Sequence, residues 1–144
     1  QIYKLLHSKN LTKGNHKYQN ITIVICIKKL NNLHKLRDII NHYSIDEINL
    51  IVCPPDQNSS KIIVTCNHYD INFMSIDEIC CKMTMQKTSG VAVDLHFEAI
   101  NFGYDTYYSE FNNATIIFGY EDNGIPNDLL NLCNKKIQFY RDYQ

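Results

Sequence analysis

The sequence has almost no excess charge, no long hydrophobic run and no paired-cysteine motif, and each absence excludes a class of protein. Its 144 residues carry a formal net charge of -1, so any nucleic-acid-binding surface must be local or supplied by another segment or subunit. No apolar run approaches the roughly 18 residues that a membrane helix needs, and no amino-terminal stretch has the layout of a secretory signal. We therefore expect a soluble, intracellular protein without a membrane partner.

Patterns of catalytic and metal-binding residues are also scarce. The six cysteines contain no C-x-x-C pair, which argues against a zinc site and against thioredoxin-like chemistry. Most of them lie inside apolar runs, where a reduced thiol acts as a small hydrophobic group. There is no G-x-S-x-G motif, no glycine-rich phosphate loop and no carboxylate pair typical of glycosidases. We expect no bound metal.

What the sequence does contain is an alternation of apolar strands and amphipathic helices. The β-branched run at 21–28 predicts a strand buried on both faces, and apolar residues at helical spacing predict a helix from Asn32 to about residue 43. A second strand is predicted over 47–53, where Pro54 and Pro55 end it. Strand, helix and strand within about 33 residues indicate a βαβ unit with a parallel strand pair.

The remaining sequence continues this alternation. Further strands are predicted over 61–66, 71–74, 91–95, 115–118 and 137–140. A helix is predicted to begin at the capping sequence Ser75-Ile-Asp-Glu78 and to run to about Gln86. Residues 1–20 show little periodicity and are expected to be an amino-terminal extension, followed by one domain at 21–144. Residues 100–111 are expected to form a loop over the sheet. The predicted fold is α/β, with a mostly parallel sheet flanked by helices.

The stretch from Thr115 to Cys133 combines a strand, a glycine-containing loop and a helix. The loop reads Gly-Tyr-Glu-Asp-Asn-Gly-Ile-Pro over 119–126, and Gly119 allows a sharp turn or the close approach of a ligand. Asn127 precedes three leucines, so we expect it to cap a helix of about two turns. In open α/β sheets such loops lie at the carboxyl ends of strands, where ligands commonly bind.

This stretch resembles the second signature motif of the SpoU (TrmH-like) RNA 2'-O-methyltransferases, in which an apolar strand leads into G-x-E-x-x-G-I-[PS] and an apolar helix. The residues that fall on this pattern without a gap are Gly119, Glu121, Gly124, Ile125 and Pro126. The resemblance implies a SPOUT-like fold, S-adenosyl-L-methionine as cofactor, tRNA or rRNA as substrate, and a homodimer. It also implies that backbone groups contact the cofactor around Leu95, Gly119, Gly124, Ile125 and Phe139.

A weaker match covers the family's first motif, in which a strand is followed by N-x-G and by an arginine six residues after the asparagine. Asn32 matches, but His34 replaces the glycine and Asp38 takes the place of the arginine, with Arg37 one residue early. By resemblance, Arg37 acts as or supports the general base, and Glu121 holds the loop and Asn32 through charge-assisted hydrogen bonds. The predicted catalytic set is therefore Arg37, Asn32 and Glu121, although Arg37 also fits an ordinary surface charge and Glu121 an ordinary loop carboxylate.

Three interpretations stay open. The first is a domain of an S-adenosylmethionine-dependent RNA ribose 2'-O-methyltransferase. The second is a degenerate SpoU-like module that binds RNA or assembles without catalysis, as suggested by His34 and Asp38. The missing third family motif suggests it as well. That motif would begin after about residue 142, and without it the family's knot would be incomplete. The third is a flavodoxin-like nucleotide-binding domain, which a phosphate-bearing ligand at Gly119 would support.

Overall fold

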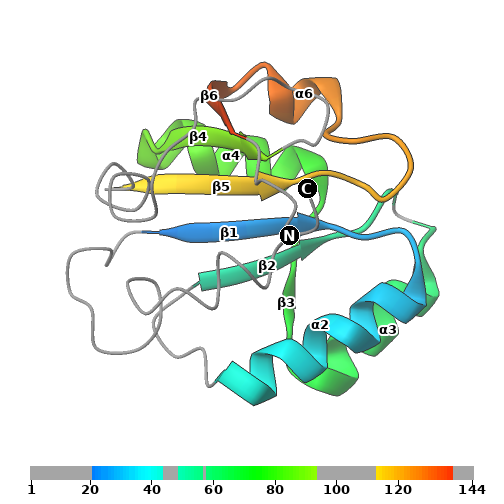
Figure 1. The fold of residues 1–144 in the computed structure, drawn as a ribbon. Helices are drawn as coiled ribbons and strands as arrows, with labels where there is room; N and C mark the ends of the chain where they lie inside the picture. Colours follow the sequence, from blue (N-terminus) through cyan, green and yellow to red (C-terminus); the bar gives the residue numbers. More distant parts are fainter. Residues whose placement is uncertain (1–20, 44–48, 57, 94–112, 138–144) are drawn as a thin grey trace, which may run out of the picture.

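A parallel sheet forms the centre of the molecule (Figure 1). The computed structural model describes residues 21–43, 49–56, 58–93 and 113–137. Within these residues the sheet has six strands in the order β3-β2-β1-β5-β4-β6, and every described pair is parallel. The strands are β1 (Thr22–Cys26), β2 (Asn49–Cys53), β3 (Asn72–Phe73), β4 (Ser89–Val93), β5 (Ala114–Phe118) and β6 (Cys133–Ile137). The predicted α/β class with a mostly parallel sheet is confirmed.

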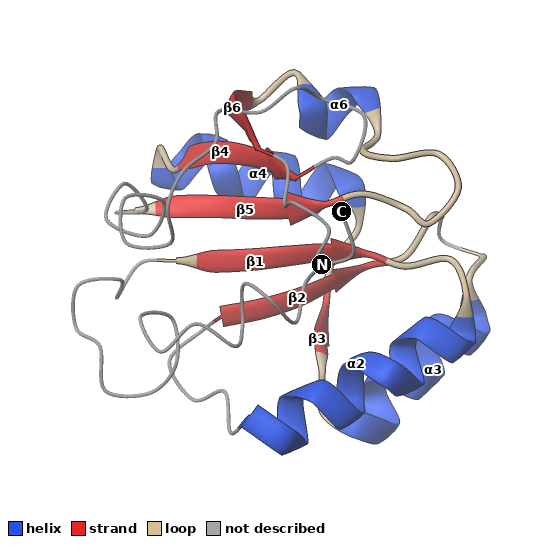
Figure 2. Cartoon of the chain, in the orientation of Figure 1, coloured by secondary structure: helices blue, strands red, loops and turns tan. Residues whose placement is uncertain are grey.

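Helices cover both faces of the sheet (Figure 2). They are α2 (Leu30–Tyr43), α3 (Ser60–Tyr69), α4 (Ile76–Gln86) and α6 (Asn127–Leu130). Along β1 the side chains alternate between two cores, because successive residues of a strand point to opposite faces. Ile23 and Ile25 pack with α2 and α3, whereas Val24 and Cys26 pack with α4 and α6. All five residues of β1 are buried, as predicted for a strand covered on both sides.

The direction in which the chain crosses the sheet changes between β1 and β5. From β1 the chain runs outward through β2 to β3, and after α4 it enters β4 and then β5, which pairs with the other side of β1. The helix that follows β1 lies on one face, and the helix that follows β5 lies on the other. The loops after these two strands therefore separate at the carboxyl edge of the sheet, which is where ligands bind in open α/β sheets. Flavodoxin-like sheets have the order 2-1-3-4-5, so the third interpretation is not supported by this strand order.

The strand predicted over residues 61–66 was wrong, because this segment lies inside helix α3. Ile62 and Cys66, four residues apart, are buried, while Val64 between them is 64% exposed. That pattern is the one-sided burial of a helix rather than the alternation of a strand. A six-residue apolar run fits both structures, and only its packing against α2 and the sheet decides between them.

The predicted start of α4 is confirmed. The Ser75 hydroxyl accepts a hydrogen bond from the backbone N–H of Glu78, and the Glu78 carboxylate accepts one from the backbone N–H of Ser75, both at 3.1 Å. This capping box satisfies two backbone donors that the first turn of a helix leaves free.

Three other element boundaries differ from the predictions. Helix α6 is a single turn that begins at Asn127, and the residue that caps it is Pro126, whose carbonyl accepts from the N–H of Leu130 at 2.9 Å. The strand expected at 137–140 already begins at Cys133. The strand expected at 91–95 begins two residues earlier, at Ser89, and includes Gly90, where a Cβ would come within 2.5 Å of the Leu132 carbonyl oxygen of the neighbouring segment.

Some predictions concern residues outside the described part of the chain. These are the extension at 1–20, the loop at 100–111, Leu95, and the residues after 137, with which the question of the knot belongs. Among the described residues, no helix combines the length and the apolar character required to cross a bilayer.

Candidate functional site

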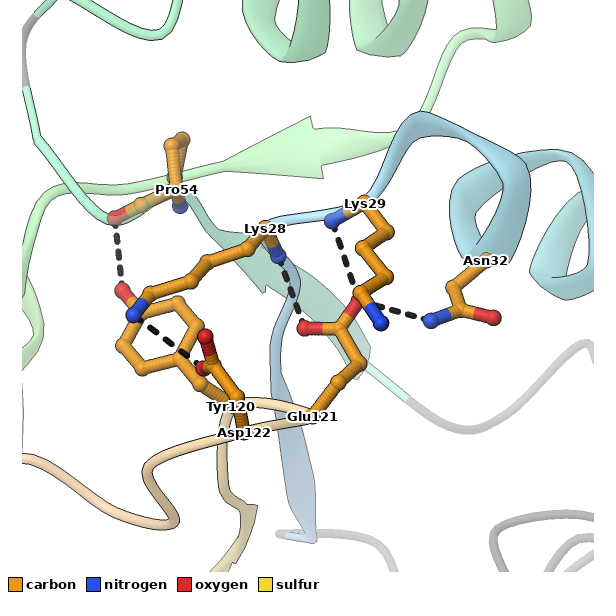
Figure 3. A network of polar contacts seen from close by, with 7 residues as sticks. All are labelled: Lys28, Lys29, Asn32, Pro54, Tyr120, Glu121 and Asp122. Atoms are coloured by element: carbon orange, nitrogen blue, oxygen red, sulfur yellow. Dashed lines mark hydrogen bonds and ion pairs between the residues drawn. The ribbon is translucent and has the colours of Figure 1, made fainter.

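The Glu121 carboxylate links the loop after β5 to the loop after β1 at the carboxyl edge of the sheet (Figure 3). It accepts hydrogen bonds from the backbone N–H groups of Lys28 at 2.9 Å and Lys29 at 3.0 Å, and from the side-chain amide of Asn32 at 2.7 Å. Lys28 and Lys29 connect β1 to α2, whereas Glu121 follows β5. A carboxylate at the start of a helix is favourable, because it pairs with free N–H groups at the positive end of the helix dipole.

These hydrogen bonds determine the charge state of Glu121. Its partial burial alone would raise the pKa, but the hydrogen bonds from Asn32, Lys28 and Lys29 outweigh burial and lower the pKa below its ordinary value. The group is therefore ionised at neutral pH, and its hydrogen bonds are charge-assisted.

The loop after β5 folds back on itself. The N–H of Tyr120 donates to the Gly124 carbonyl at 2.8 Å, and the N–H of Gly124 donates to the Tyr120 carbonyl at 3.0 Å. Gly124 has a φ of 75°, a backbone conformation that favours glycine. A Cβ on Gly119 would lie 2.4 Å from the carbonyl carbon of Gly124 and 2.5 Å from the nitrogen of Ile125. The predicted turn at Gly119 is confirmed, and it is the loop's own backbone that approaches this glycine.

A second anchor of this loop is Tyr120, whose side chain is buried. Its hydroxyl donates a hydrogen bond of 2.7 Å to the carbonyl of Pro54, directly after β2, and lies 3.6 Å from the Cys53 sulfur. Burial raises the pKa of Tyr120, so the phenol stays protonated and continues to donate. The loop is therefore bonded to the chain after β1 through Glu121 and to the chain after β2 through Tyr120.

The Lys28 side chain also contacts the loop after β5. The Lys28 Nζ is 3.2 Å from a carboxylate oxygen of Asp122 and 5.3 Å from the centroid of the Tyr120 ring. The hydrogen bond from Lys28 lowers the pKa of Asp122. In Figure 3 the Lys28 side chain extends past the Tyr120 ring to Asp122, while its own backbone N–H points to Glu121. Lys28 thus contacts the loop with both its main chain and its side chain.

Two solved structures share this arrangement of strands and helices. One is the SpoU methyltransferase AviRb from Streptomyces viridochromogenes, with 13% sequence identity and a TM-score of 0.54 over 87% of this chain and 51% of that chain. The other is described as "a probable methylase family protein from Haemophilus influenzae Rd KW20", with 14% identity and a TM-score of 0.57 over 88% of this chain and 58% of that chain. The fold is that of the SpoU methyltransferases. The chain spans a little over half the length of these two proteins.

At these identities the likeness concerns the fold. No protein-family model and no curated protein sequence matches the chain. The SpoU-like fold that the loop sequence indicated is therefore established by the arrangement of the strands and helices.

Most of the predicted site residues that the structure describes lie together in this SpoU-like fold. Asn32 contacts Glu121 directly, and Gly119, Gly124 and Ile125 lie in the same folded loop. The other two residues predicted to contact a cofactor, Leu95 and Phe139, are outside the described residues. The contacts of Tyr120 with Pro54, and of the Lys28 and Lys29 backbone with Glu121, were not predicted, because they join segments far apart in the sequence.

Arg37 is not brought to Glu121. Its guanidinium carbon lies 4.8 Å from the centroid of the Tyr69 ring, and its Nε lies 3.6 Å from a carboxylate oxygen of Asp38. Five residues along an α-helix correspond to a rotation of about 140° beyond one full turn, so Arg37 and Asn32 point to different sides of α2. The predicted catalytic set is thus divided. Asn32 and Glu121 lie together at the start of α2, and Arg37 lies on another side of that helix.

The cysteines are all free thiols. Cys26 and Cys53 are register partners on β1 and β2, and the neighbouring Cys53 thiol together with burial raises the pKa of Cys26. Burial raises the pKa of Cys66 and of Cys133 to about 11. Cys26, Cys66 and Cys133 are therefore protonated at neutral pH and pack in the two cores as small hydrophobic groups. Within the described residues, no group of three or more His, Cys, Asp and Glu side chains is arranged to hold a metal ion.

Proposed function

We propose that this chain is a domain of an RNA ribose 2'-O-methyltransferase that uses S-adenosyl-L-methionine. The observation that carries the proposal is the Glu121 carboxylate, which ties the loop after β5 to the start of α2 in a SpoU-like fold. This connection lies where the chain direction changes between β1 and β5, the usual ligand position in open α/β sheets.

The loop after β5 is anchored before any ligand binds. Tyr120 and Glu121 hold it from two directions, to the chain after β2 and to the chain after β1. An anchored loop loses little conformational freedom when a ligand binds, which favours affinity. Backbone groups of Gly119, Gly124 and Ile125 would hold the cofactor, together with Leu95 and Phe139 according to the resemblance. When bound, S-adenosylmethionine supplies an electrophilic sulfonium methyl group.

The residues of the chain would contribute mainly orientation. Methyl transfer requires the ribose hydroxyl to lose its proton while it is held in line with the methyl group. In this proposal Glu121 and Asn32 are positioning residues, because they fix the loop relative to α2. The Lys28 ammonium adjoins the same loop and would pair with an RNA phosphate. The predicted role of Arg37 in accepting the proton stays a separate prediction, since its guanidinium packs on Tyr69.

The proposed partners are RNA, such as tRNA or rRNA, and a second copy of the chain. With a net charge of -1, the protein would bind RNA through a local surface rather than through an overall positive charge. Light scattering across a concentration series tests the homodimer, and a mass that stays at one chain contradicts it.

Calorimetric titration with S-adenosylhomocysteine tests the cofactor, and titration with flavin mononucleotide serves as the matched alternative. Micromolar binding of the first ligand alone supports the proposal. Binding of the flavin alone, or of neither ligand, contradicts it. Transfer of a tritiated methyl group to RNA transcripts then tests the reaction. A 2'-O-methyl group protects the adjacent phosphodiester from alkaline cleavage, so labelled alkali-resistant dinucleotides identify the ribose as the acceptor.

The placement of Arg37 favours one alternative, a SpoU-like module that binds RNA without catalysis. In that case the loop after β5 is retained for folding, and Arg37, the arginine among the described residues, is not directed at the methyl group. RNA binding without detectable binding of S-adenosylhomocysteine, and without methyl transfer, would favour this alternative.

A further inference from the structure

We propose that a small polar groove beside Tyr69 holds one base of a single-stranded segment of the RNA substrate, several nucleotides away from the modified one. The inference rests on the proposed RNA substrate and assigns a contact surface to it. The groove has a volume of about 200 Å³ and is lined by Arg37, Asn41, Asn49, Tyr69, Asp70 and Asn72, among others. Sites for drug-sized ligands begin at about 300 Å³, so this groove fits a single planar ring system.

The wall of the groove offers a stacking surface. The Arg37 guanidinium lies over the Tyr69 ring at 4.8 Å from its centroid. The Tyr69 hydroxyl is 2.6 Å from the Nδ1 of His34, and the His34 ring meets the Tyr69 ring edge-on at 5.7 Å. Tyr69 is thus held between two residues of α2. Bases in single-stranded RNA stack on guanidinium planes as well as on aromatic rings, so a base would continue the stack of Tyr69 and Arg37.

The other walls of the groove carry groups that can bind the edge of a base. Asn41, Asn49 and Asn72 are exposed, and each side-chain amide both donates and accepts hydrogen bonds. Asp70 also lines the groove, and a carboxylate can accept hydrogen bonds from the amino groups that adenine, guanine and cytosine carry. This carboxylate disfavours a phosphate inside the groove, so the geometry points to a base as the bound group and leaves the phosphate outside.

The position of the groove relates it to the proposed methyl-transfer site. His34, Arg37 and Asn41 follow one another at helical spacing and form one stripe along α2. Asn32, at the start of the same helix, contacts Glu121. Asn49 begins β2 and is the register partner of Thr22 at the start of β1, so the groove lies toward the amino edge of the sheet, whereas Glu121 contacts Lys28 beyond the end of β1. Helix α2 runs between these two places, so a base in the groove belongs to a nucleotide several positions away from the one at Glu121.

Fluorescence anisotropy with a labelled single-stranded oligoribonucleotide of mixed sequence tests this assignment on the whole chain. We expect Arg37→Ala and Tyr69→Ala each to weaken binding roughly tenfold, the loss typical of removing one stacked base. Lys82→Ala is the matched control, because it removes one positive charge from α4 on the opposite face of the sheet. It should leave the affinity within about twofold, since a single charge away from the groove contributes little to binding.

Arg37→Lys separates stacking from charge and keeps the test valid if Tyr69→Ala fails to fold. A lysine retains the positive charge but lacks the planar group, so binding should fall nearly as far as in Arg37→Ala. Full affinity in Arg37→Lys, or unchanged RNA affinity in both alanine variants, overturns the proposal. No binding of RNA by the unmodified chain overturns it as well.

Steady-state methylation kinetics separate this role from a catalytic one. If Arg37 holds a base distant from the reacting nucleotide, Arg37→Ala raises the KM for RNA and leaves kcat nearly constant. A fall in kcat of about a hundredfold or more at unchanged KM overturns the proposal and favours a general-base role. Titration of the unmodified chain with S-adenosylhomocysteine tests the methyltransferase proposal independently, because the anisotropy experiment contains no cofactor.

Discussion

The side-chain amide of Asn32 donates a 2.7 Å hydrogen bond to Glu121, 89 positions later in the chain. Together with the pairing of β1 and β5, this contact connects the first βαβ unit to the segment that begins with β5. Asn32 follows β1 and Glu121 follows β5, so the contact holds the two loops together at the carboxyl edge of the sheet. A change at either residue should therefore affect both the stability of the domain and the shape of its proposed ligand site.

Replacement of Glu121 by glutamine should lower the free energy of unfolding by about 1–2 kcal/mol, a value reduced for the partial exposure of the side chain. A glutamine has one accepting oxygen, while its amide group donates and would face the donors of Lys29 and Asn32. Urea denaturation measures the change. The control is Asp122→Asn, which removes an exposed carboxylate paired only with Lys28 among the described residues. An equal loss in both variants would contradict the assigned role of Glu121.

The contribution of Glu121 to stability should depend on pH in a defined direction. Its pKa is lower in the folded chain than in the unfolded chain, so the stabilisation is complete above the unfolded value of about 4.3 and is lost as the pH falls through the folded pKa. The difference in unfolding free energy between the wild type and Glu121→Gln should be constant from neutral pH to about pH 5 and then shrink. Urea titrations at successive pH values test this, and a difference that grows on acidification would refute it.

The loop around Glu121 was predictable because its determinants are local. The turn depends on Gly119 and Gly124, which act on residues close to them in the sequence. The cap of α4 was predictable for the same reason, because Ser75 and Glu78 are three residues apart. The partners of Glu121 were not all predictable. The backbone donors at Lys28 and Lys29 carry no sequence pattern, because every residue except proline has such a group.

Arg37 and α3 show two different limits of sequence reasoning. A shift of one residue turns a helical side chain by about 100°, so a match that is one residue out of register does not determine which side of α2 Arg37 occupies. The structure directs it to Tyr69. For α3, the apolar run at 61–66 fits a strand or a helix, and the exposure of Val64 follows only from the packing of the whole domain.

Gly119→Ala should destabilise the domain by about 1–3 kcal/mol, because the added methyl group meets backbone atoms that cannot rotate away. The nearest are the carbonyl carbon of Gly124 at 2.4 Å and the nitrogen of Ile125 at 2.5 Å. Thermal unfolding followed by circular dichroism measures the loss. Asn123→Ala, at an exposed position of the same turn, is the control and should change stability by less than about 0.5 kcal/mol. A fully stable Gly119→Ala variant would show that the loop can open without cost.

Tyr120→Phe should lower the free energy of unfolding by about 1–2 kcal/mol, since it removes the buried donor of the Pro54 carbonyl. The Tyr120 hydroxyl donates to the Pro54 carbonyl oxygen at 2.7 Å. The Cys53 thiol, a weak donor, lies 3.7 Å from the same carbonyl oxygen. Tyr69→Phe is the matched control, because its hydroxyl contacts the exposed His34 and competes with water. Its loss should be under about 0.5 kcal/mol.

Tyr120→Phe also tests whether anchoring of the loop after β5 affects binding of the proposed cofactor. The phenylalanine ring keeps the packing of position 120, but the loop is then attached to the rest of the sheet mainly through Glu121. We expect the affinity for S-adenosylhomocysteine in Tyr120→Phe to fall several-fold, because ordering the loop becomes part of the cost of binding. Calorimetric titration of the unmodified chain and of Tyr120→Phe measures the difference in affinity. An unchanged affinity in Tyr120→Phe, together with the expected loss of stability, would mean that Glu121 alone positions the loop for the ligand.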